Sequence, residues 1–534
     1  MRNFKTTART IVRRNGAGRL LRGALLTTFA LTLQPAFATP GNNPPSLASV
    51  IARYVILGEA NGETVAWARA VIRPGYQCPA LVVGGEDTVM TTRENPHFFP
   101  VIVCEGRIAF TATSILRLTD GTLDLPMPVL KPERVAVLGD SGCKLGSSDY
   151  HCDSGSPAEP FQSLATAAAR KQPDLVLHMG DYNYRGTVGP ILFSQSGKNP
   201  GPPVEKWPYD AGDFSTTSEQ CEQNADAGFY SQNALNSNAP DVWDNWRDDF
   251  FRPAQDLLSA APWIAVRGNH ELCSRSGPGY FYFLDPSSNL GEGQRHCPQA
   301  KAEAPPFENV LLPEPYTVSL GDLAVVVLDS ANACDYFTNP NFLPSYVEQM
   351  QQVDAAVDAL PDGVAAWMVS HRPIFGAQRY DSRGSVACAG SDQWACTGQT
   401  LQAAVRAGPG KLPERFDLLL AGHMHRFQST SFPDGSRPPM IVVGTSGVQL
   451  ENDGPFGSVD LTIDGSSASV LSLGAKVDVD STRQDAFGYL DLVRTGSNWR
   501  ADLVNPPKGV SLVNCASDAM PVCRLAKEVS PVAK

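Results

Sequence analysis

Basic side chains are scarce in this sequence of 534 residues, where 43 Lys and Arg stand against 55 Asp and Glu, a net charge of −12. A basic footprint for nucleic acid is therefore not expected. No two cysteines have the C-x2-C spacing of a thiolate metal site, and no G-x-x-x-x-G-K-[ST] loop for ATP phosphates occurs. The apolar run 23–33 is shorter than the roughly 20 residues that cross a bilayer, so it is not expected to be a membrane anchor, and no membrane span is expected in the mature chain.

The first 38 residues predict an export signal. They hold seven basic residues and no acid, then the apolar run, and then Ala36-Phe37-Ala38, a small-x-small cleavage site. The pair Arg13-Arg14 leaves the twin-arginine route open beside general secretion. We expect cleavage after Ala38 and a periplasmic or secreted mature protein.

The 12 cysteines all follow this signal, and an even number in an exported protein predicts disulfides. Connectivity does not follow from sequence, but several cysteines lie close enough in the chain to close local loops. The pairing we expect is Cys78–Cys104, Cys143–Cys152, Cys221–Cys334, Cys273–Cys297, Cys388–Cys396 and Cys515–Cys523.

Patterning divides the mature chain into regions. Short alternating runs between Gly and Asp turns predict a β domain early in the chain, whereas later strand-like runs alternate with helix-like runs such as 161–170, which is typical of α/β layers. No internal repeat is visible. The expected regions are the signal at 1–38, a linker at 39–47, an N-terminal β domain at 48–130, a catalytic domain at 131–475, and a β-hairpin with a cysteine-closed tail at 476–534.

Five apolar runs end in the same kinds of polar side chain. Each run is typical of a buried strand, and ligand sites of open α/β sheets lie just beyond the carboxyl ends of strands. We therefore expect these segments to converge although they are far apart in the sequence. They read GDSG at 139–142, GDYNY at 180–184, GNHE at 268–271, SHRP at 370–373 and GHMH at 422–425.

The polar residues of these segments are two Asp, one Asn, three His and one Tyr. Carboxylate, amide and imidazole groups suit Fe, Mn or Zn in an oxygen and nitrogen environment. The set exceeds what one tetrahedral zinc needs, so two metals that share a carboxylate are the simplest interpretation. Two-metal sites clamp a phosphoryl group and activate a water.

The five segments, in this order, resemble the calcineurin-like metallophosphoesterase superfamily over about 133–475. The motif Asp140-Ser-Gly142 and the G-D-x-x-Y spacing that ends in Tyr184 are similar to its purple acid phosphatase branch. One departure is Met368, where that branch usually has Val. The resemblance implies an α/β fold, an αββα sandwich of two mixed sheets flanked by helices.

The resemblance also implies the roles of the site residues. Two metal ions are expected, Fe with Zn, Mn or Fe, and an activated hydroxide attacks phosphorus. His270 serves as the catalytic residue at the leaving group of a small phosphate-ester substrate. The metal ligands are Asp140, Tyr184 and His425 for the first ion, Asp181 as the bridge, and Asn269, His371 and His423 for the second.

Several alternatives remain open at the level of sequence. An acid-phosphatase-like phosphomonoesterase is favoured over a phosphodiesterase of nucleotides or phospholipid head groups, and a non-catalytic envelope binding protein stabilised by metal is the remote alternative. Arg185 and Arg372 could bind phosphate or pair with acids. The long interval 186–261 is expected to cover the metals, or else to be a solvated excursion. The sequence does not indicate an oligomeric state.

Overall fold

The computed structural model describes thirteen stretches of the chain. The predicted export signal at 1–38 lies outside them, as do Cys152, Cys221 and most of the interval 186–261. The described residues fall within one compact unit. They are 41–96, 99–143, 158–185, 241–273, 275–297, 311–338, 340, 342–379, 387–451, 457–477, 483–506, 510–517 and 521–526.

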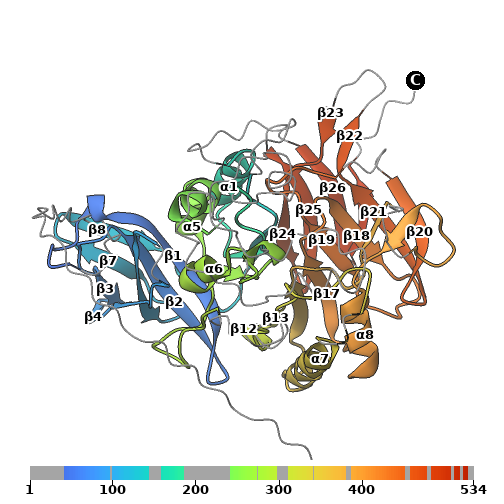
Figure 1. Cartoon of the computed structure of the whole chain (residues 1–534), viewed down its shortest axis with the longest axis horizontal. Helices are drawn as coiled ribbons and strands as arrows, with labels where there is room; N and C mark the ends of the chain where they lie inside the picture. The colour runs from blue at the N-terminus through green and yellow to red at the C-terminus, as the bar shows by residue number, and fades with distance from the viewer. Residues whose placement is uncertain are drawn as a thin grey trace, which may run out of the picture. The chain divides into compact units, whose positions relative to one another are not determined.

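Two mixed sheets form the framework (Figure 1). The first sheet has 11 strands in the order β27 (Pro521–Leu525), β26 (Val510–Ser517), β25 (Asn498–Asn505), β24 (Tyr489–Thr495), β9 (Arg134–Leu138), β10 (Leu175–His178), β11 (Trp263–Ala265), β1 (Val50–Ala60), β2 (Glu63–Ile72), β6 (Ile102–Ile108) and β5 (Thr91–Thr92). The second has eight in the order β12 (Tyr316–Leu320), β13 (Leu323–Leu328), β14 (Ala365–Ser370), β17 (Phe416–Ala421), β19 (Met440–Val443), β18 (Phe427–Ser431), β21 (Ser466–Leu473) and β20 (Gly457–Ile463).

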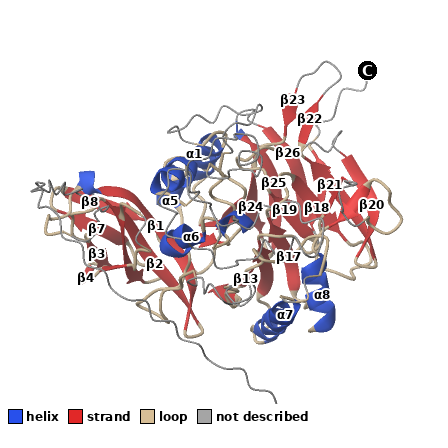
Figure 2. Cartoon of the chain, viewed as in Figure 1, coloured by secondary structure: helices blue, strands red, loops and turns tan. Residues whose placement is uncertain are grey.

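Smaller elements complete the fold. The small sheets are β4 (Glu86–Thr88), β3 (Ala80–Val83), β7 (Ser114–Leu118) and β8 (Gly121–Leu125), then β15 (Ala377–Arg379) with β16 (Trp394–Cys396), and β22 (Ala475–Val477) with β23 (Arg483–Asp485). The helices, blue in Figure 2, are η1 (Leu47–Ser49), α1 (Phe161–Arg170), α4 (Trp243–Trp246), the π-helix η3 (Arg247–Phe251), α5 (Gln255–Ala260), η4 (Asn269–Glu271), α6 (Gly277–Phe283), α7 (Leu343–Asp358) and α8 (Gln399–Ala407).

Side chains that point alternately to the two faces of each strand explain how the layers pack together. In β9, Val135 and Val137 pack into a core that also takes side chains from the second sheet, whereas Ala136 and Leu138 pack into a core with α1, α4 and α5. On the far side of the second sheet, Met368 of β14 packs into a third core with α7 and α8. The order helix, sheet, sheet, helix confirms the αββα fold class predicted above.

The first sheet runs through all three regions expected in the mature chain. Strand β1 of the N-terminal β region pairs with β11 in parallel through Ile56 and Trp263. Strand β24 of the predicted C-terminal hairpin pairs with β9 in antiparallel orientation. The division into domains at 48–130, 131–475 and 476–534 stays a prediction. The hydrogen-bonded ladder of the first sheet nevertheless joins strands from all three ranges.

A buried charge cluster joins the N-terminal β region to α6. Arg93 and Arg69 both reach the same oxygen of Glu105, at 2.6 and 3.3 Å. Their guanidinium groups also donate to helix-terminal carbonyls, Arg93 to Tyr282 at 2.9 Å and Arg69 to Phe283 at 2.9 Å. Because the last carbonyls of a helix lack partners within it, the two arginines act as a cap from outside the helix.

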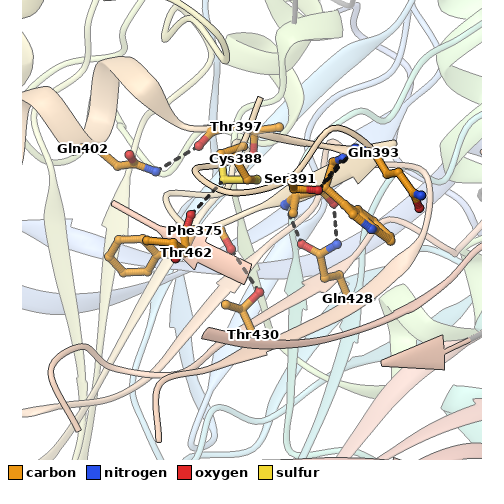
Figure 3. Close-up of a disulfide and its surroundings, with 12 residues drawn as sticks. Phe375, Cys388, Ser391, Gln393, Thr397, Gln402, Gln428, Thr430 and Thr462 are labelled. Atoms are coloured by element: carbon orange, nitrogen blue, oxygen red, sulfur yellow. Dashed lines mark hydrogen bonds between the residues drawn. A yellow bond between two sulfur atoms is a disulfide. The ribbon is translucent and has the colours of Figure 1, made fainter. Parts of the chain in front are cut away.

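Four of the expected disulfides are present among the described residues: Cys78–Cys104, Cys273–Cys297, Cys388–Cys396 and Cys515–Cys523. Figure 3 shows the pair Cys388–Cys396, which closes the loop before β16. Close by, the hydroxyl of Thr430 on β18 donates to the carbonyl of Phe375 at 3.1 Å. Across the described part of the chain, no helix is long and apolar enough to cross a bilayer.

Candidate metal centre

The polar segments singled out from the sequence all follow carboxyl ends of strands in the two sheets. Asp140 follows β9 and Asp181 follows β10, while Asn269 opens the short η4 turn after β11. These three strands are parallel neighbours, so their ends lie at one edge of the first sheet. In the second sheet, His371 follows β14 and His423 follows its parallel neighbour β17.

The first group of ligand atoms consists of Asp140, Asp181 and His425, whose donor atoms all lie within 4.8 Å of one another. The hydroxyl of Tyr184 lies in the same group. It is 3.0 Å from Asp140 Oδ1, 2.8 Å from Asp181 Oδ2 and 3.3 Å from His425 Nε2. The structure therefore brings together the residues expected around the first metal.

The second group consists of Asp181, His371 and His423, again with donor atoms within 4.8 Å of one another. Asn269 Oδ1 lies 2.8 Å from His371 Nε2 and 2.8 Å from His423 Nδ1. Asp181 belongs to both groups. One carboxylate shared between two sets of oxygen and nitrogen donors fits a dinuclear metal site, and these hard donors suit first-row metals.

The burial of the two acids also fits a cationic occupant. Asp140 and Asp181 are 0% and 1% exposed. Burial, together with the neighbouring Asp181 carboxylate, raises the pKa of Asp140 well above its usual range. Since two buried carboxylates at this distance repel each other, positive charge placed between them stabilises both in the ionised form that binds metal.

His270 lies beside both groups without belonging to either. Its backbone N–H donates to Asp181 Oδ1 at 2.8 Å, and its ring packs on that of Tyr184 with centroids 4.1 Å apart. The side chain is nearly buried. This position next to the shared carboxylate suits a residue that contacts the substrate rather than a metal.

The backbone is strained at three of the candidate ligands. Asp140, Asp181 and His423 have φ values of 56°, 58° and 72°, in the left-handed region that residues other than glycine rarely adopt. Such strain persists only where the surrounding structure imposes it, and it gathers at functional sites. At Asp181, the carboxylate of Glu271 imposes it by accepting hydrogen bonds from the backbone N–H groups of Asp181 at 2.9 Å and Gly268 at 3.0 Å.

Gly268 must be glycine because Asp181 lies against it. A Cβ at Gly268 would stand 2.1 Å from Asp181 Oδ1 and 2.3 Å from its backbone nitrogen. We expect Gly268→Ala to displace Asp181 and to lower the bound metal, measured by elemental analysis after dialysis. The control is Gly457→Ala, because a Cβ added at Gly457 would have no atom of a residue other than its chain neighbours within 4 Å. Equal metal content in the two variants would show that the close approach is not needed.

Two positioning residues went unnoticed in the sequence. Asp249, in the π-helix η3, accepts hydrogen bonds from the backbone N–H groups of Tyr184 at 2.8 Å and Arg185 at 3.0 Å. Asp335 lies 2.9 Å from His423 Nε2, so that ring turns its Nδ1 toward Asn269. Neither aspartate belongs to a motif, and no local sequence signal marks them.

These two aspartates also pair with the two arginines whose roles the sequence left open. Arg185 forms a buried ion pair with Asp249, and Arg372 forms one with Asp335. Burial raises the pKa of Asp335, but Arg372 and His423 outweigh burial and hold that pKa at about 2. Both arginines therefore pair with acids, the second of the two alternatives considered for them.

Two further polar residues near the ends of strands lie outside both ligand groups. His178 lies within β10, contacts Ser141 at 2.9 Å and stacks on Tyr182 with centroids 4.1 Å apart. Burial lowers its pKa to about 3, so it is a neutral core residue. Asp329, which follows β13 outside any motif, binds Arg267 at 2.7 Å and is not part of either ligand group.

Fold and site together define a hydrolase of the dinuclear-metal class. The family model of calcineurin-like phosphoesterases matches residues 133–427, so the chain belongs to that family. It is a metal-dependent phosphoric ester hydrolase.

Solved structures with a similar chain path include the purple acid phosphatase PPD1 of yellow lupin seeds, at 13% identity and a TM-score of 0.45, covering 86% of this chain and 73% of that one. Another is GAP50 of Plasmodium, described as the anchor in the inner membrane complex, at 11% identity and a TM-score of 0.33, covering 72% and 88%. No curated protein matches.

Proposed function

We propose that this protein is an exported phosphomonoesterase of the acid phosphatase type. The observation that carries the proposal is the hydroxyl of Tyr184, which lies among Asp140, Asp181 and His425. A phenolate is a hard donor that suits Fe(III). Iron is therefore proposed for the first group of ligands and Zn, Mn or Fe for the second.

The residue assignments follow the two groups. Asp140, Tyr184 and His425 hold the first ion, Asp181 bridges, and Asn269, His371 and His423 hold the second. When bound, the ions supply positive charge to the phosphate oxygens and activate the attacking water. His270 is oriented through its own backbone bond to Asp181 and stabilises the departing ester oxygen. The four described disulfides and the signal-like segment at 1–38 support export.

The test is hydrolysis of a chromogenic aryl phosphomonoester and its diester by the mature chain, with Fe, Mn and Zn supplied separately across the pH range. We expect a monoester preference at acid pH with iron present, together with a visible absorption band from phenolate bound to Fe(III). A diester preference near neutral pH, best with Mn or Zn, would favour the phosphodiesterase instead.

Two variants separate the role of Tyr184 from general packing. Tyr184→Phe should abolish the visible band while iron stays bound. Tyr182→Phe is the control, because Tyr182 is equally buried but bonds to the carbonyl of Val266 at 3.0 Å. An unchanged band in Tyr184→Phe would remove Tyr184 from the ligand set.

A further inference from the structure

The side chain of Arg275 lies against the third motif. Its Nη2 is 3.2 Å from His270 Nε2, and its Nη1 donates to the carbonyl of Asn269 at 3.2 Å. A guanidinium has donors only, so His270 Nε2 is the acceptor in the first contact. Arg275 is half-buried. A positive charge is thus fixed beside the residue assigned to the leaving group.

The turn that carries this arginine is tightly held. The backbone N–H of Arg275 donates to the carbonyl of Leu272 at 2.8 Å, and the hydroxyl of Ser276 donates to the carbonyl of His270 at 2.6 Å. The disulfide Cys273–Cys297 ties down the same turn. Because the backbone is already ordered, little conformational entropy is lost when the side chain meets a ligand.

The position of this guanidinium differs from that of the other two arginines near the ligands. Arg185 and Arg372 are bound to the buried carboxylates of Asp249 and Asp335. Arg372 also reaches His423 Nε2 at 2.8 Å, whereas Arg275 contacts Asn269 and His270, the second of which is the residue proposed for the leaving group.

We propose that Arg275 binds a non-bridging oxygen of the substrate and makes the site prefer dianionic phosphomonoesters to monoanionic phosphodiesters. This inference rests on the hydrolase function proposed above and names its substrate class. A monoester has three non-bridging oxygens and a diester has two, so an oxygen that faces Arg275 carries charge in a monoester and an alkyl or aryl group in a diester. Charge-assisted hydrogen bonds to phosphate favour the former.

The proposed exchange moves one of the contacts described above. Nη1 keeps its bond to Asn269, while Nη2 leaves His270 Nε2 for the phosphate oxygen. His270 Nε2, which accepted the hydrogen bond from Arg275, can then take up a proton from water and donate it to the departing ester oxygen. Binding of a monoester thereby makes His270 Nε2 available to the ester oxygen, whereas with a diester the hydrogen bond from Arg275 to His270 Nε2 remains.

The experiment compares the full-length wild type with Arg275→Gln and Arg275→Lys, each loaded with the same metals. The control is Arg107→Gln, which removes an exposed arginine paired with Glu63 at 3.7 Å. The readouts are kcat/KM for the aryl monoester and diester, metal content, and the Kd of inorganic phosphate by calorimetry.

We expect Arg275→Gln to lower the monoester kcat/KM by about 10- to 100-fold, as for one lost hydrogen bond to a charged group, and to raise the phosphate Kd about as much. The diester value and metal content should change little, and Arg275→Lys should recover part of the loss. An equal fall for both esters, or an unchanged phosphate Kd, overturns the proposal.

The two proposals can fail separately. If the wild type hydrolyses neither ester with any metal supplied, the proposed function fails, and the phosphate titration alone decides the role of Arg275. Weaker phosphate binding in Arg275→Gln than in the wild type then supports that role. Equal binding, or no binding by either, refutes it.

Discussion

Asp181→Asn should leave the protein unable to hold two metal ions and should lower phosphoester hydrolysis by about a thousand-fold. The reason is that Asp181 is the one residue common to both groups of ligand atoms in the described part of the chain. An amide offers one neutral oxygen in place of two charged ones, so it cannot bridge two cations. The measurement is metal content per chain by elemental analysis, together with turnover of the aryl monoester.

A matched variant controls for the charge that is removed. Asp460→Asn takes away one carboxylate from the exposed side of β20, far in sequence from every motif. It should keep both ions and full turnover. If Asp181→Asn also kept both ions and full turnover, the assignment of the metal centre would be wrong.

Glu105→Gln should destabilise the whole protein by about 3–5 kcal/mol, the cost of breaking a buried ion pair by removing one partner. Glu105 is fully buried and is the carboxylate shared by Arg69 and Arg93. Without its charge, two buried guanidinium groups face each other. The measurement is the free energy of unfolding in urea, or Tm where unfolding is irreversible.

The effect should depend on pH with a definite sign. Burial raises the pKa of Glu105, but Arg69, Arg93 and Ser288 outweigh burial and bring that pKa below its usual value. A lowered pKa in the folded state gives stability that is present above the unfolded-state pKa and is lost as the pH falls through the folded-state value. The difference between wild type and Glu105→Gln should therefore shrink in acid.

The control for this variant is Glu63→Gln, in the neighbouring strand. Glu63 pairs with Arg107 at 3.7 Å, and both side chains are largely exposed. Exposed pairs contribute about 1 kcal/mol or less, so its stability should barely change. A loss of the same size in both variants would mean that burial of the cluster does not matter.

Local pattern was enough to predict much of the fold. The helix expected at 161–170 coincides with α1, and the expected hairpin forms β24 and β25. The five motifs were visible because each follows a strand-length apolar run, and in four of them a glycine stands directly before the polar residue. These are properties of neighbouring residues, which a single sequence displays directly.

What the sequence did not reveal depends on residues far apart in the chain. Asp335 acquires its role from His423, and Arg69 from carbonyls more than 200 positions away. Asp140 likewise has a left-handed backbone that no local pattern marked, and its backbone N–H donates to the carbonyl of Gly180 at 3.0 Å. The interval 186–261 was expected to cover the metals or else to be a solvated segment, and that stays a prediction for 186–240, which lie outside the described residues. The described part, 241–261, forms helical turns packed in a core.

The path of the chain through the first sheet has a consequence for how the protein folds. Strand β1 has one edge unpaired until β11, more than 200 residues later, is available. Strand β9 likewise has one edge unpaired until β24, near the other end of the chain, is available. Contacts of such long sequence separation form slowly, because the entropy of closing a long loop is lost before the contacts stabilise the fold. Were the protein exported unfolded by general secretion, as the proposal of export allows, its central sheet could not close until nearly all of the chain had crossed the membrane.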